Sequence, residues 1–295
     1  MTAAIQPISL DLPVEVSILR EDLLFPEMSG NKFRKLKYNL EEARCQGHNT
    51  LLTFGGAFSN HIDAVSAAGQ RFGFNTIGII RGEETALENP TLSRAAARGM
   101  ELHFIDREAY RQKNAPTFIE ALRQRFGDFY LLPEGGTNEL AVAGCAEILS
   151  AQTNRFDYIC CAVGTGGTLA GLANGAADHQ QVIGFPAVKA DLIETEIQKL
   201  VSRSNWRIQR GYEFGGYAKI SQELIGFMNR FYQLHKIPTD PVYTAKLLFG
   251  VIDRIQKGHF APGSSILLVH TGGLQGIAGM NDRLKKSNLP PIDYV

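Results

Sequence analysis

The chain has 295 residues, of which 44% are hydrophobic and 20% charged, and its 30 basic side chains balance 30 acidic ones. This composition is typical of a globular protein with a sizeable core, and the zero net charge argues against nucleic acid or an anionic membrane as a partner. None of the four cysteines forms a Cys-x-x-Cys pair, so we expect neither disulfides nor a metal site.

The start of the sequence has no basic segment followed by an apolar core, and no apolar run approaches membrane-spanning length. We therefore expect a cytoplasmic protein without a membrane partner. The first helical stretch carries a basic cluster, which consists of Lys32, Arg34, Lys35 and Lys37. We expect most of these charges to lie on a solvated helix face.

Lys32 lies near the start of this helix, just after Gly30 and Asn31. A partly desolvated lysine at the positive end of a helix would have a lowered pKa and be a better nucleophile toward an aldehyde. On its own, however, the pattern is that of a solvated surface lysine.

From about residue 30 onward, short apolar runs alternate with stretches of helical periodicity. The expected strands are 50–54, 76–80, 101–105, 129–132, 158–163, 181–185 and 265–270, and helices are expected over 59–72 and 89–98. Strands separated by helices predict parallel sheets with both faces covered.

Glycine-rich turns follow several of these strands. Gly55-Gly56 follows the first, Gly164-Thr165-Gly166-Gly167-Thr168 the strand at 158–163, and Thr271-Gly272-Gly273 the last. In open α/β sheets ligands bind outside the carboxyl ends of the strands, so these turns indicate a ligand site.

The turn from Gly164 to Thr168 opens a helical pattern, and its N–H groups together with the helix dipole favour an anion such as phosphate. It has neither the Gly-Lys-Ser/Thr of a nucleotide P-loop nor a Gly-x-Gly-x-x-Gly spacing, which disfavours ATP, GTP and dinucleotides. Taken alone, a tight connection without a ligand is an equally good interpretation.

The segment from Gly55 to His61 repeats this arrangement. Ser59 and Asn60 are good N-cap residues, and the helix after them would offer free N–H groups to a second anion such as a substrate carboxylate. In isolation the simpler interpretation is a capped helix, with His61 as a surface or capping histidine.

Taken in order, the segments resemble fold-type II pyridoxal-phosphate enzymes, and more narrowly the family of D-cysteine desulfhydrase and 1-aminocyclopropane-1-carboxylate deaminase. The resemblance rests on Asn31-Lys32-x-Arg34-Lys35-Leu36, Gly56-x-x-Ser59-Asn60-His61, Gly164-Thr165-Gly166-Gly167-Thr168, Asp240-Pro241-Val242-Tyr243-Thr244-x-Lys246 and His270-Thr271-Gly272-Gly273. It spans nearly the whole chain, from about Gly30 to Gly273.

The resemblance implies an α/β fold like that of the tryptophan synthase β-subunit, with two unequal open twisted sheets, helices on both faces and pyridoxal 5'-phosphate between two domains. The larger, cofactor-binding domain would comprise residues 1–44 and 131–295, and the smaller, inserted domain residues 45–130. A homodimer and a small amino-acid substrate are implied as well.

The resemblance also implies roles for single residues. Lys32 would bind the cofactor covalently and later move the substrate α-proton, while Asn60 would hydrogen-bond the phenolic oxygen. The residues cupping the phosphate would be Gly164, Thr165, Gly166, Gly167 and Thr168. Ser59, with the N–H groups around Asn60 and His61, would bind the substrate carboxylate or act on the reacting carbon.

On the substrate side of the ring the resemblance places Tyr243, with Tyr217 as a second tyrosine, and it puts Thr244 or Thr271 against the pyridine nitrogen. Deaminase members carry Glu after the tyrosine, whereas this chain has Thr244. A hydroxyl does not stabilise a pyridinium charge. Without a carboxylate at the pyridine nitrogen, the cofactor ring would store less negative charge. This favours loss of the α-proton together with a β-substituent, which predicts conversion of D-cysteine to pyruvate, sulfide and ammonia.

The alternatives are 1-aminocyclopropane-1-carboxylate deamination, dehydration or racemisation by the same fold, and a non-catalytic relative that binds the cofactor. The chain departs from its relatives at Ile62-Asp63, where an apolar residue and Arg are usual, and around Tyr217, where Tyr-Gly-x-Pro-Asn is missing. We expect both departures to lie near the substrate pocket.

Overall fold

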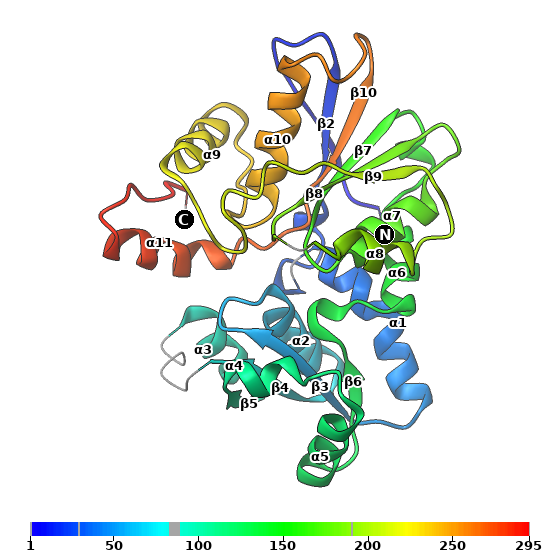
Figure 1. The fold of residues 1–295 in the computed structure, drawn as a ribbon, viewed down its shortest axis with the longest axis vertical. Coiled ribbons are helices and arrows are strands. Elements are labelled where there is room, and N and C mark those ends of the chain that lie inside the picture. The colour runs from blue at the N-terminus through cyan, green and yellow to red at the C-terminus, as the bar shows by residue number, and fades with distance from the viewer. Residues whose placement is uncertain (1, 29, 83–88, 190, 295) are drawn as a thin grey trace.

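The computed structural model describes residues 2–28, 30–82, 89–189 and 191–294. The chain forms two lobes, each built on its own sheet, and helix α1 (Asn31–Cys45) lies between them (Figure 1). Four short 3-10 segments, Glu21–Leu23, Pro26–Met28, Glu134–Gly136 and Ala151–Thr153, complete the connections.

The larger sheet has six strands in the order β1-β2-β10-β7-β8-β9. They are β1 (Ile5–Ile8), β2 (Glu15–Leu19), β7 (Tyr158–Val163), β8 (Gln181–Pro186), β9 (Trp206–Ile208) and β10 (Ser265–Val269). Only the pair β1 and β2 is antiparallel, and every other neighbouring pair is parallel.

Helices cover both faces of the larger sheet. One face packs against α6 (Glu139–Ala146), α7 (Gly167–Gly175) and α8 (Ile193–Gln198), and the other against α9 (Gln222–His235) and α10 (Thr244–Gln256). Within β7, Ile159 and Cys161 belong to the first core and Cys160 and Ala162 to the second. Because both faces are buried, the strand is apolar throughout rather than alternating.

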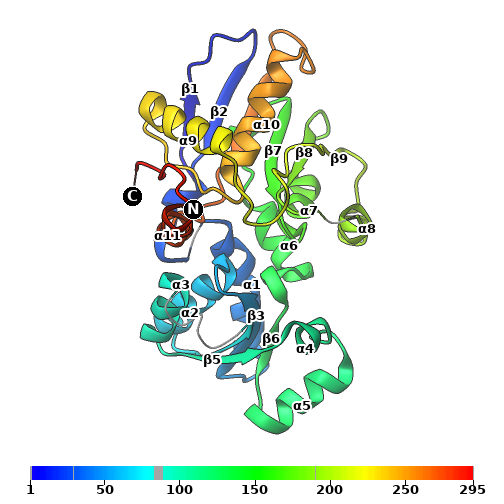
Figure 2. The ribbon, with the colours of Figure 1, turned by 60° about the vertical axis from the view of Figure 1, so that its left-hand side comes forward.

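The smaller sheet is entirely parallel and has the order β5-β4-β3-β6. Its strands are β3 (Thr50–Gly56), β4 (Asn75–Arg81), β5 (Met100–Ile105) and β6 (Tyr130–Leu132). Helices α2 (Asn60–Phe72) and α3 (Pro90–Ala97) cover one face; α4 (Arg107–Arg111) and α5 (Pro116–Phe126) lie on the other (Figure 2). Helix α11 (Gly276–Lys286) contacts α3 from the larger lobe.

The expected fold class, two unequal sheets of mainly parallel strands with helices on both faces, is confirmed. Each predicted strand is present, the one at 158–163 with the same bounds and the others with ends that differ by at most two residues, whereas β1, β2 and β9 were not predicted. The division into domains at residues 44/45 and 130/131 stays a prediction, and β6 begins at Tyr130, the last residue of the smaller predicted unit.

The expected solvated helix face on α1 is wrong for two of its four basic residues. Arg34 and Lys35 are buried, and the Arg34 guanidinium donates from Nε and NH2 to the Glu21 carboxylate at 3.0 and 2.8 Å. The cause is the position of α1 between the lobes, which leaves it little solvated surface. Lys37 does pair outward, with Glu147 at 2.7 Å.

The described part of the chain contains four free cysteines and no group of three or more side chains suited to a metal ion. Within the same residues, no helix combines the length and apolar character that crossing a bilayer requires.

Candidate active site

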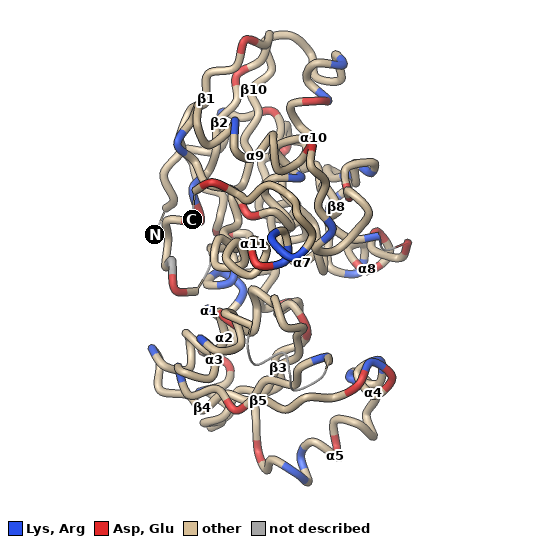
Figure 3. The backbone as a smooth tube through the Cα atoms, turned by 90° about the vertical axis from the view of Figure 1, so that its left-hand side faces the viewer, with Lys and Arg blue, Asp and Glu red and all other residues tan. Residues whose placement is uncertain are grey.

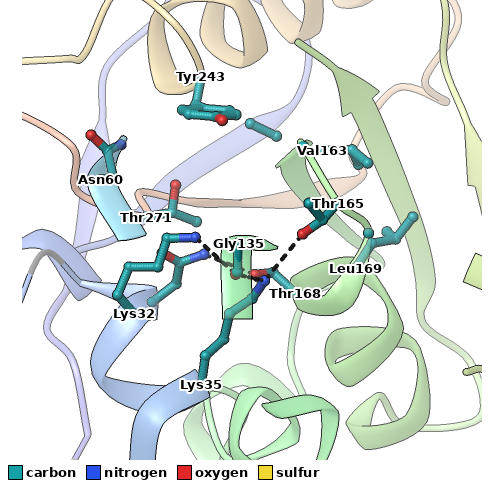
Figure 4. Close-up of a pocket in the computed structure, with 14 residues that line it drawn as sticks. Lys32, Lys35, Asn60, Gly135, Val163, Thr165, Thr168, Leu169, Tyr243 and Thr271 are labelled. Carbon is teal, nitrogen blue, oxygen red and sulfur yellow. Dashed lines mark hydrogen bonds between the residues drawn. The ribbon is translucent and has the colours of Figure 1, made fainter. Parts of the chain in front are cut away.

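A cavity of about 60 Å³ lies between the lobes, where the start of α1 faces the turns after β7 and β10 (Figure 4). Its lining includes the predicted site residues Lys32, Asn60, Gly164, Thr165, Gly166, Thr168, Tyr243 and Thr271. Residues more than 200 positions apart in the sequence thus meet at one place. We call this space the inner cavity.

Lys32 reaches the inner cavity because α1 begins directly against the turn after β10. Gly30 has a φ of +57°, and a Cβ there would lie 2.6 Å from the carbonyl oxygen of Thr271, so only glycine permits this approach. The Lys32 ammonium donates to the Gly135 carbonyl at 3.3 Å. Burial, and then the charge of Lys35, lower the pKa of Lys32 well below its usual value, which increases the fraction of nucleophilic amine.

Lys35 lies one helical turn further along α1, and the resemblance implied no role for it at the site. Its Nζ donates to the Gly135 carbonyl at 2.9 Å, to Thr137 Oγ1 at 2.9 Å and to Thr165 Oγ1 at 3.4 Å. Burial lowers its pKa. A buried ammonium therefore lies beside the glycine-rich turn, with no carboxylate among its bonded partners.

The glycine-rich turn has the shape of an anion cradle. Gly166 has a φ of +88°, and a Cβ on it would lie 2.4 Å from Ile197 Cγ1. The chain then enters α7 at Gly167, where the first helical N–H groups have no intrahelical partner. Thr168 Oγ1 accepts from Asn31 Nδ2 at 2.8 Å, which joins α1 to this helix. Backbone N–H groups, threonine hydroxyls and a lysine fit a phosphate group.

A second, open pocket of about 300 Å³ adjoins the inner cavity. The two share six lining residues: Lys32, Asn60, Gly135, Gly164, Thr165 and Tyr243. The open pocket also brings together the predicted Ser59, His61 and Tyr217. We call it the substrate pocket.

Ser59 is the N-cap of α2, and its Oγ accepts from the backbone N–H of Ile62 at 3.3 Å. The N–H groups of Asn60 and His61 lie in the first turn of that helix, where no intrahelical acceptor exists. Asn60 is fixed by Gln275, whose Nε2 donates to Asn60 Oδ1 at 2.6 Å. This end of the pocket can receive a carboxylate.

The interpretation of His61 as a surface or capping histidine is wrong, because the side chain is 2% exposed. Thr53 Oγ1 donates to the Leu132 carbonyl and lies 2.9 Å from His61 Nε2, so the imidazole donates from Nε2. Burial, with the charges of Lys32 and Lys35, lowers the pKa of His61 well below its usual value. The imidazole is therefore neutral, and its backbone N–H is the group available to a carboxylate.

Tyr217 and Tyr243 meet edge to face with ring centroids 6.3 Å apart. Burial raises the pKa of Tyr243 well above its usual value, so its hydroxyl keeps its proton. Tyr217 lies between Gly216 and Ala218, whose φ angles are +115° and +52°. Such backbone is strained outside glycine and persists where the surroundings hold it.

Lys246 holds the loop before Tyr217. The side chain is 1% exposed, and its ammonium donates to the carbonyls of Glu213 and Gly216 at 2.8 Å each, and to that of Ala187 at 3.5 Å. Burial lowers the pKa of Lys246 to about 8. An element of the larger lobe thereby fixes one wall of the substrate pocket.

The two threonine candidates for the pyridine nitrogen differ in their surroundings. Thr271 lines the inner cavity, whereas Thr244 lines neither pocket. The buried Thr244 hydroxyl has no hydrogen-bond partner among the described residues. Both threonines thus remain candidates.

The departure at Asp63 does not lie in the substrate pocket, contrary to expectation. Asp63 is 2% exposed and accepts from Arg94 Nε at 2.8 Å and from Arg98 NH1 at 3.0 Å. Its charge joins α2 to α3. The departure around Tyr217 does lie at the pocket, as expected.

Sequence reasoning missed Lys35, Gly135, Arg81 and Glu134 as pocket residues. Gly135 carried a usable signal, because Glu134-Gly135-Gly136 follows the strand β6 just as the other glycine-rich turns follow theirs. Arg81 ends β4 immediately before Gly82, again at the carboxyl edge of the sheet. Lys35 gave no such signal, since its burial depends on how the lobes pack around α1.

Several known proteins have sequences related to this chain. A family described as pyridoxal-phosphate dependent enzymes matches residues 3–272. A Pyrococcus abyssi protein named putative 1-aminocyclopropane-1-carboxylate deaminase is 31% identical over 291 residues, which cover 92% of this chain and 88% of that protein. An Arabidopsis thaliana protein named bifunctional D-cysteine desulfhydrase/1-aminocyclopropane-1-carboxylate deaminase, mitochondrial, is 31% identical over 300 residues, with 92% and 75% covered.

A crystal structure described as an ACC deaminase homologue superimposes with a TM-score of 0.83 at 28% identity, and covers 97% of this chain and 94% of that one. The expectations of an enzyme and of a pyridoxal-phosphate cofactor are confirmed by these relatives. With its family match over most of its length, its two-lobed fold and its lysine at the mouth of a glycine-rich cup, the chain belongs to the fold-type II pyridoxal-phosphate-dependent enzymes.

Proposed function

We propose that the chain catalyses α,β-elimination on a small amino acid, with D-cysteine and one water giving pyruvate, ammonia and hydrogen sulfide. The observation that carries the proposal is the place of Lys32, a lysine of lowered pKa that lines both the inner cavity and the substrate pocket. A single amine there can serve the cofactor and the substrate in turn.

The inner cavity would hold the cofactor. Gly164 to Thr168 would bind its phosphate, and the Lys35 ammonium would neutralise part of the phosphate charge at the Thr165 end of the cup. Asn60 would donate to the phenolic oxygen. When bound, pyridoxal phosphate delocalises the electrons of the bond that breaks at the substrate α-carbon.

The substrate pocket would orient that bond. Ser59 and the N–H groups of Asn60 and His61 would bind the α-carboxylate, and Lys32 would take the α-proton. The thiolate then leaves with the electron pair of its bond to the β-carbon. Tyr217 and Tyr243 form the opposing wall, and a protonated phenol there can donate to the leaving sulfur.

Deamination of 1-aminocyclopropane-1-carboxylate is the second candidate, because the Pyrococcus and Arabidopsis relatives carry that activity in their names. Thr244 favours elimination over cyclopropane opening, since its hydroxyl offers no negative charge to a protonated ring nitrogen. Both reactions use the same lysine and carboxylate site.

The test is a spectrum followed by a substrate panel. Protein purified with pyridoxal phosphate and dialysed should keep a near-visible absorbance band that borohydride removes, and mass spectrometry should then locate the reduced cofactor on Lys32. Pyruvate formation is next measured with D-cysteine, L-cysteine and D-serine, and α-keto acid formation with the cyclopropane substrate.

Elimination predicts the fastest turnover with D-cysteine. Faster turnover of the cyclopropane substrate would support deamination, and the opposite enantiomer without keto acid would support racemisation. A cofactor band without turnover of any amino acid would identify a non-catalytic relative and overturn the proposal.

We also propose a homodimer, on the strength of the resemblance set out above, and a cytoplasmic location, as expected from the sequence. Light scattering of the purified protein checks the dimer by its mass. Fractionation of the source cells checks the compartment.

A further inference from the structure

An arginine, Arg81, lines the substrate pocket in addition to Lys32. Arg81, the last residue of β4, pairs in register with Gly56 on the neighbouring strand. A Cβ on Gly56 would lie 3.6 Å from Arg81 NH2, so the guanidinium lies against the turn that leads to Ser59. It lines the same pocket as Lys32.

Arg81 also belongs to a second open space. A cleft of about 380 Å³ is lined by Arg81, Arg107, Tyr110, Arg111, Lys113 and Glu134. Arg81 and Glu134 line both this cleft and the substrate pocket, so the two spaces are adjacent. Figure 3 shows basic residues on α4, which supplies two of the arginines.

The single carboxylate of the cleft is already engaged. Glu134 accepts from the Tyr110 hydroxyl at 2.8 Å and lies 3.3 Å from Lys113 Nζ. Among the described residues, no carboxylate pairs with Arg81, Arg107 or Arg111. Among its described lining residues the cleft therefore has four cationic side chains and one carboxylate.

The Arg81 guanidinium also packs on an aromatic ring. Its guanidinium carbon lies 5.4 Å from the ring centroid of Tyr110, a residue that is 3% exposed. A guanidinium on an aromatic face retains its donors for a planar anion. The buried ring, whose hydroxyl donates to Glu134, limits the positions that the guanidinium can take.

We propose that Arg81, with Arg107 and Arg111 behind it, forms a subsite for a second anionic group on the substrate. The subsite would extend the substrate range beyond D-cysteine to amino acids whose β-substituent ends in a carboxylate or a similar oxyanion. This inference rests on the proposed function, because the first anion, the α-carboxylate, is assigned to Ser59 and the start of α2. Arg81 is then left without a role toward a substrate as small as D-cysteine.

The test uses two unreactive acids that differ by one carboxylate, propionate and succinate. Calorimetry on the cofactor-loaded protein gives both affinities without any turnover. We expect succinate to bind at least fivefold more tightly than propionate, with a preference that declines as salt rises. Arg81→Gln should remove most of that preference, and the double variant Arg107→Gln/Arg111→Gln part of it.

Arg125→Gln is the matched control, because Arg125 is exposed on α5 and lines neither the cleft nor the pocket. It should leave the preference for succinate intact. Because Arg107 and Arg111 are exposed on α4, their double variant keeps the test valid if Arg81→Gln fails to fold.

Two results would overturn the subsite. Equal weakening of propionate and succinate by Arg81→Gln would assign Arg81 to the α-carboxylate, and equal affinities in the unaltered protein would show that no second anion is bound. Failure of the proposed function has a different signature, namely absent turnover in the substrate panel, and leaves these binding constants measurable.

Discussion

At the cofactor end of the site the polar side chains bond to one another, whereas at the substrate end several face open space. Asn31 donates to Thr168, and Lys35 donates to Gly135, Thr137 and Thr165. By contrast, Tyr217 is 39% exposed, and Arg81 has no carboxylate partner among the described residues. One end is organised before any ligand arrives, and the other is shaped to admit different substrates.

This difference between the two ends explains why the sequence predicts the cofactor but not the substrate. A preorganised anion site needs glycines and a lysine at fixed spacing, so it leaves a motif. An open pocket is specified by a few side chains from separate elements, such as Arg81 on β4 and Val188 after β8. Those positions carry no shared pattern along the chain.

The largest expected loss of activity comes from removing the Lys32 amine, which lines both the inner cavity and the substrate pocket. Lys32→Ala should lower kcat with D-cysteine by about 10³-fold or more, because nucleophile and base are lost together. The matched control is Lys37→Ala on the same helix, whose ammonium pairs with Glu147. Steady-state kinetics and the absorbance spectrum check both variants. A borohydride-sensitive band in Lys32→Ala would contradict the assignment.

At the substrate end, Tyr217→Phe should lower kcat/KM by about 10- to 100-fold through loss of a proton donor. The dissociation constant of pyridoxal phosphate should not change, because Tyr217 is absent from the inner cavity. An absorbance titration measures the cofactor and a pyruvate assay measures turnover. If Tyr217→Phe weakens cofactor binding as much as it lowers turnover, Tyr217 contributes to the cofactor site as well as to the substrate pocket.

At the cofactor end, Gly166→Ala should weaken pyridoxal phosphate about tenfold and lower the free energy of unfolding by about 1–3 kcal/mol. The added Cβ would lie 2.4 Å from Ile197 Cγ1 at a φ of +88°. Gly211→Ala is the control, because Gly211 has a φ of +100° with no atom within 4 Å of an added Cβ. If both variants weaken the cofactor equally, backbone strain rather than the shape of the cup is responsible.

The smallest effect concerns pH and Lys246, whose pKa is lowered to about 8 by burial. Between pH 8 and the ordinary lysine value of about 10.4, the unfolded chain binds a proton that the folded chain does not. The contribution of Lys246 to the free energy of unfolding therefore rises across this window. Urea unfolding at several pH values should show this rise in the unaltered protein and not in Lys246→Met.

Turnover should move in the opposite direction. Above pH 8 the neutral amine has two N–H donors for three carbonyls, so the loop that carries Tyr217 loosens. We expect kcat to fall a few-fold above pH 8 while stability rises. A kcat profile for Lys246→Met that keeps the same decline would remove Lys246 as its cause.

Much of the fold was predictable because it follows from local patterns. The strands at 50–56 and 158–163 are largely apolar and lead into glycine-rich turns, and such runs mark strands buried on both faces. The missed strands β1 and β9 span four and three residues, and neither is an unbroken apolar run, because β1 contains Gln6 and Pro7 and β9 contains Arg207. They are held mainly by their neighbours in the sheet.

Site residues were predictable where they belong to a motif on one segment. They were not predictable where the position of a side chain depends on which elements pack together. Asp63 was expected near the substrate, but it pairs with Arg94 and Arg98, more than thirty residues away. Arg34 was expected in solvent and pairs with Glu21. No pattern in the sequence relates these partners, because each pair forms only when two elements pack.

Helix α1 also sets the spacing between Lys32 and Lys35. Lys32 and Lys35 donate to the same carbonyl, that of Gly135, from positions three residues apart, or about 4.5 Å along the helix axis. The distance from the reactive amine to the ammonium beside the phosphate cup is thereby set by one turn of backbone. Deleting one residue between them would rotate the second lysine by about 100° around the axis. The number of residues between the two lysines therefore decides whether both ammonium groups can reach the Gly135 carbonyl.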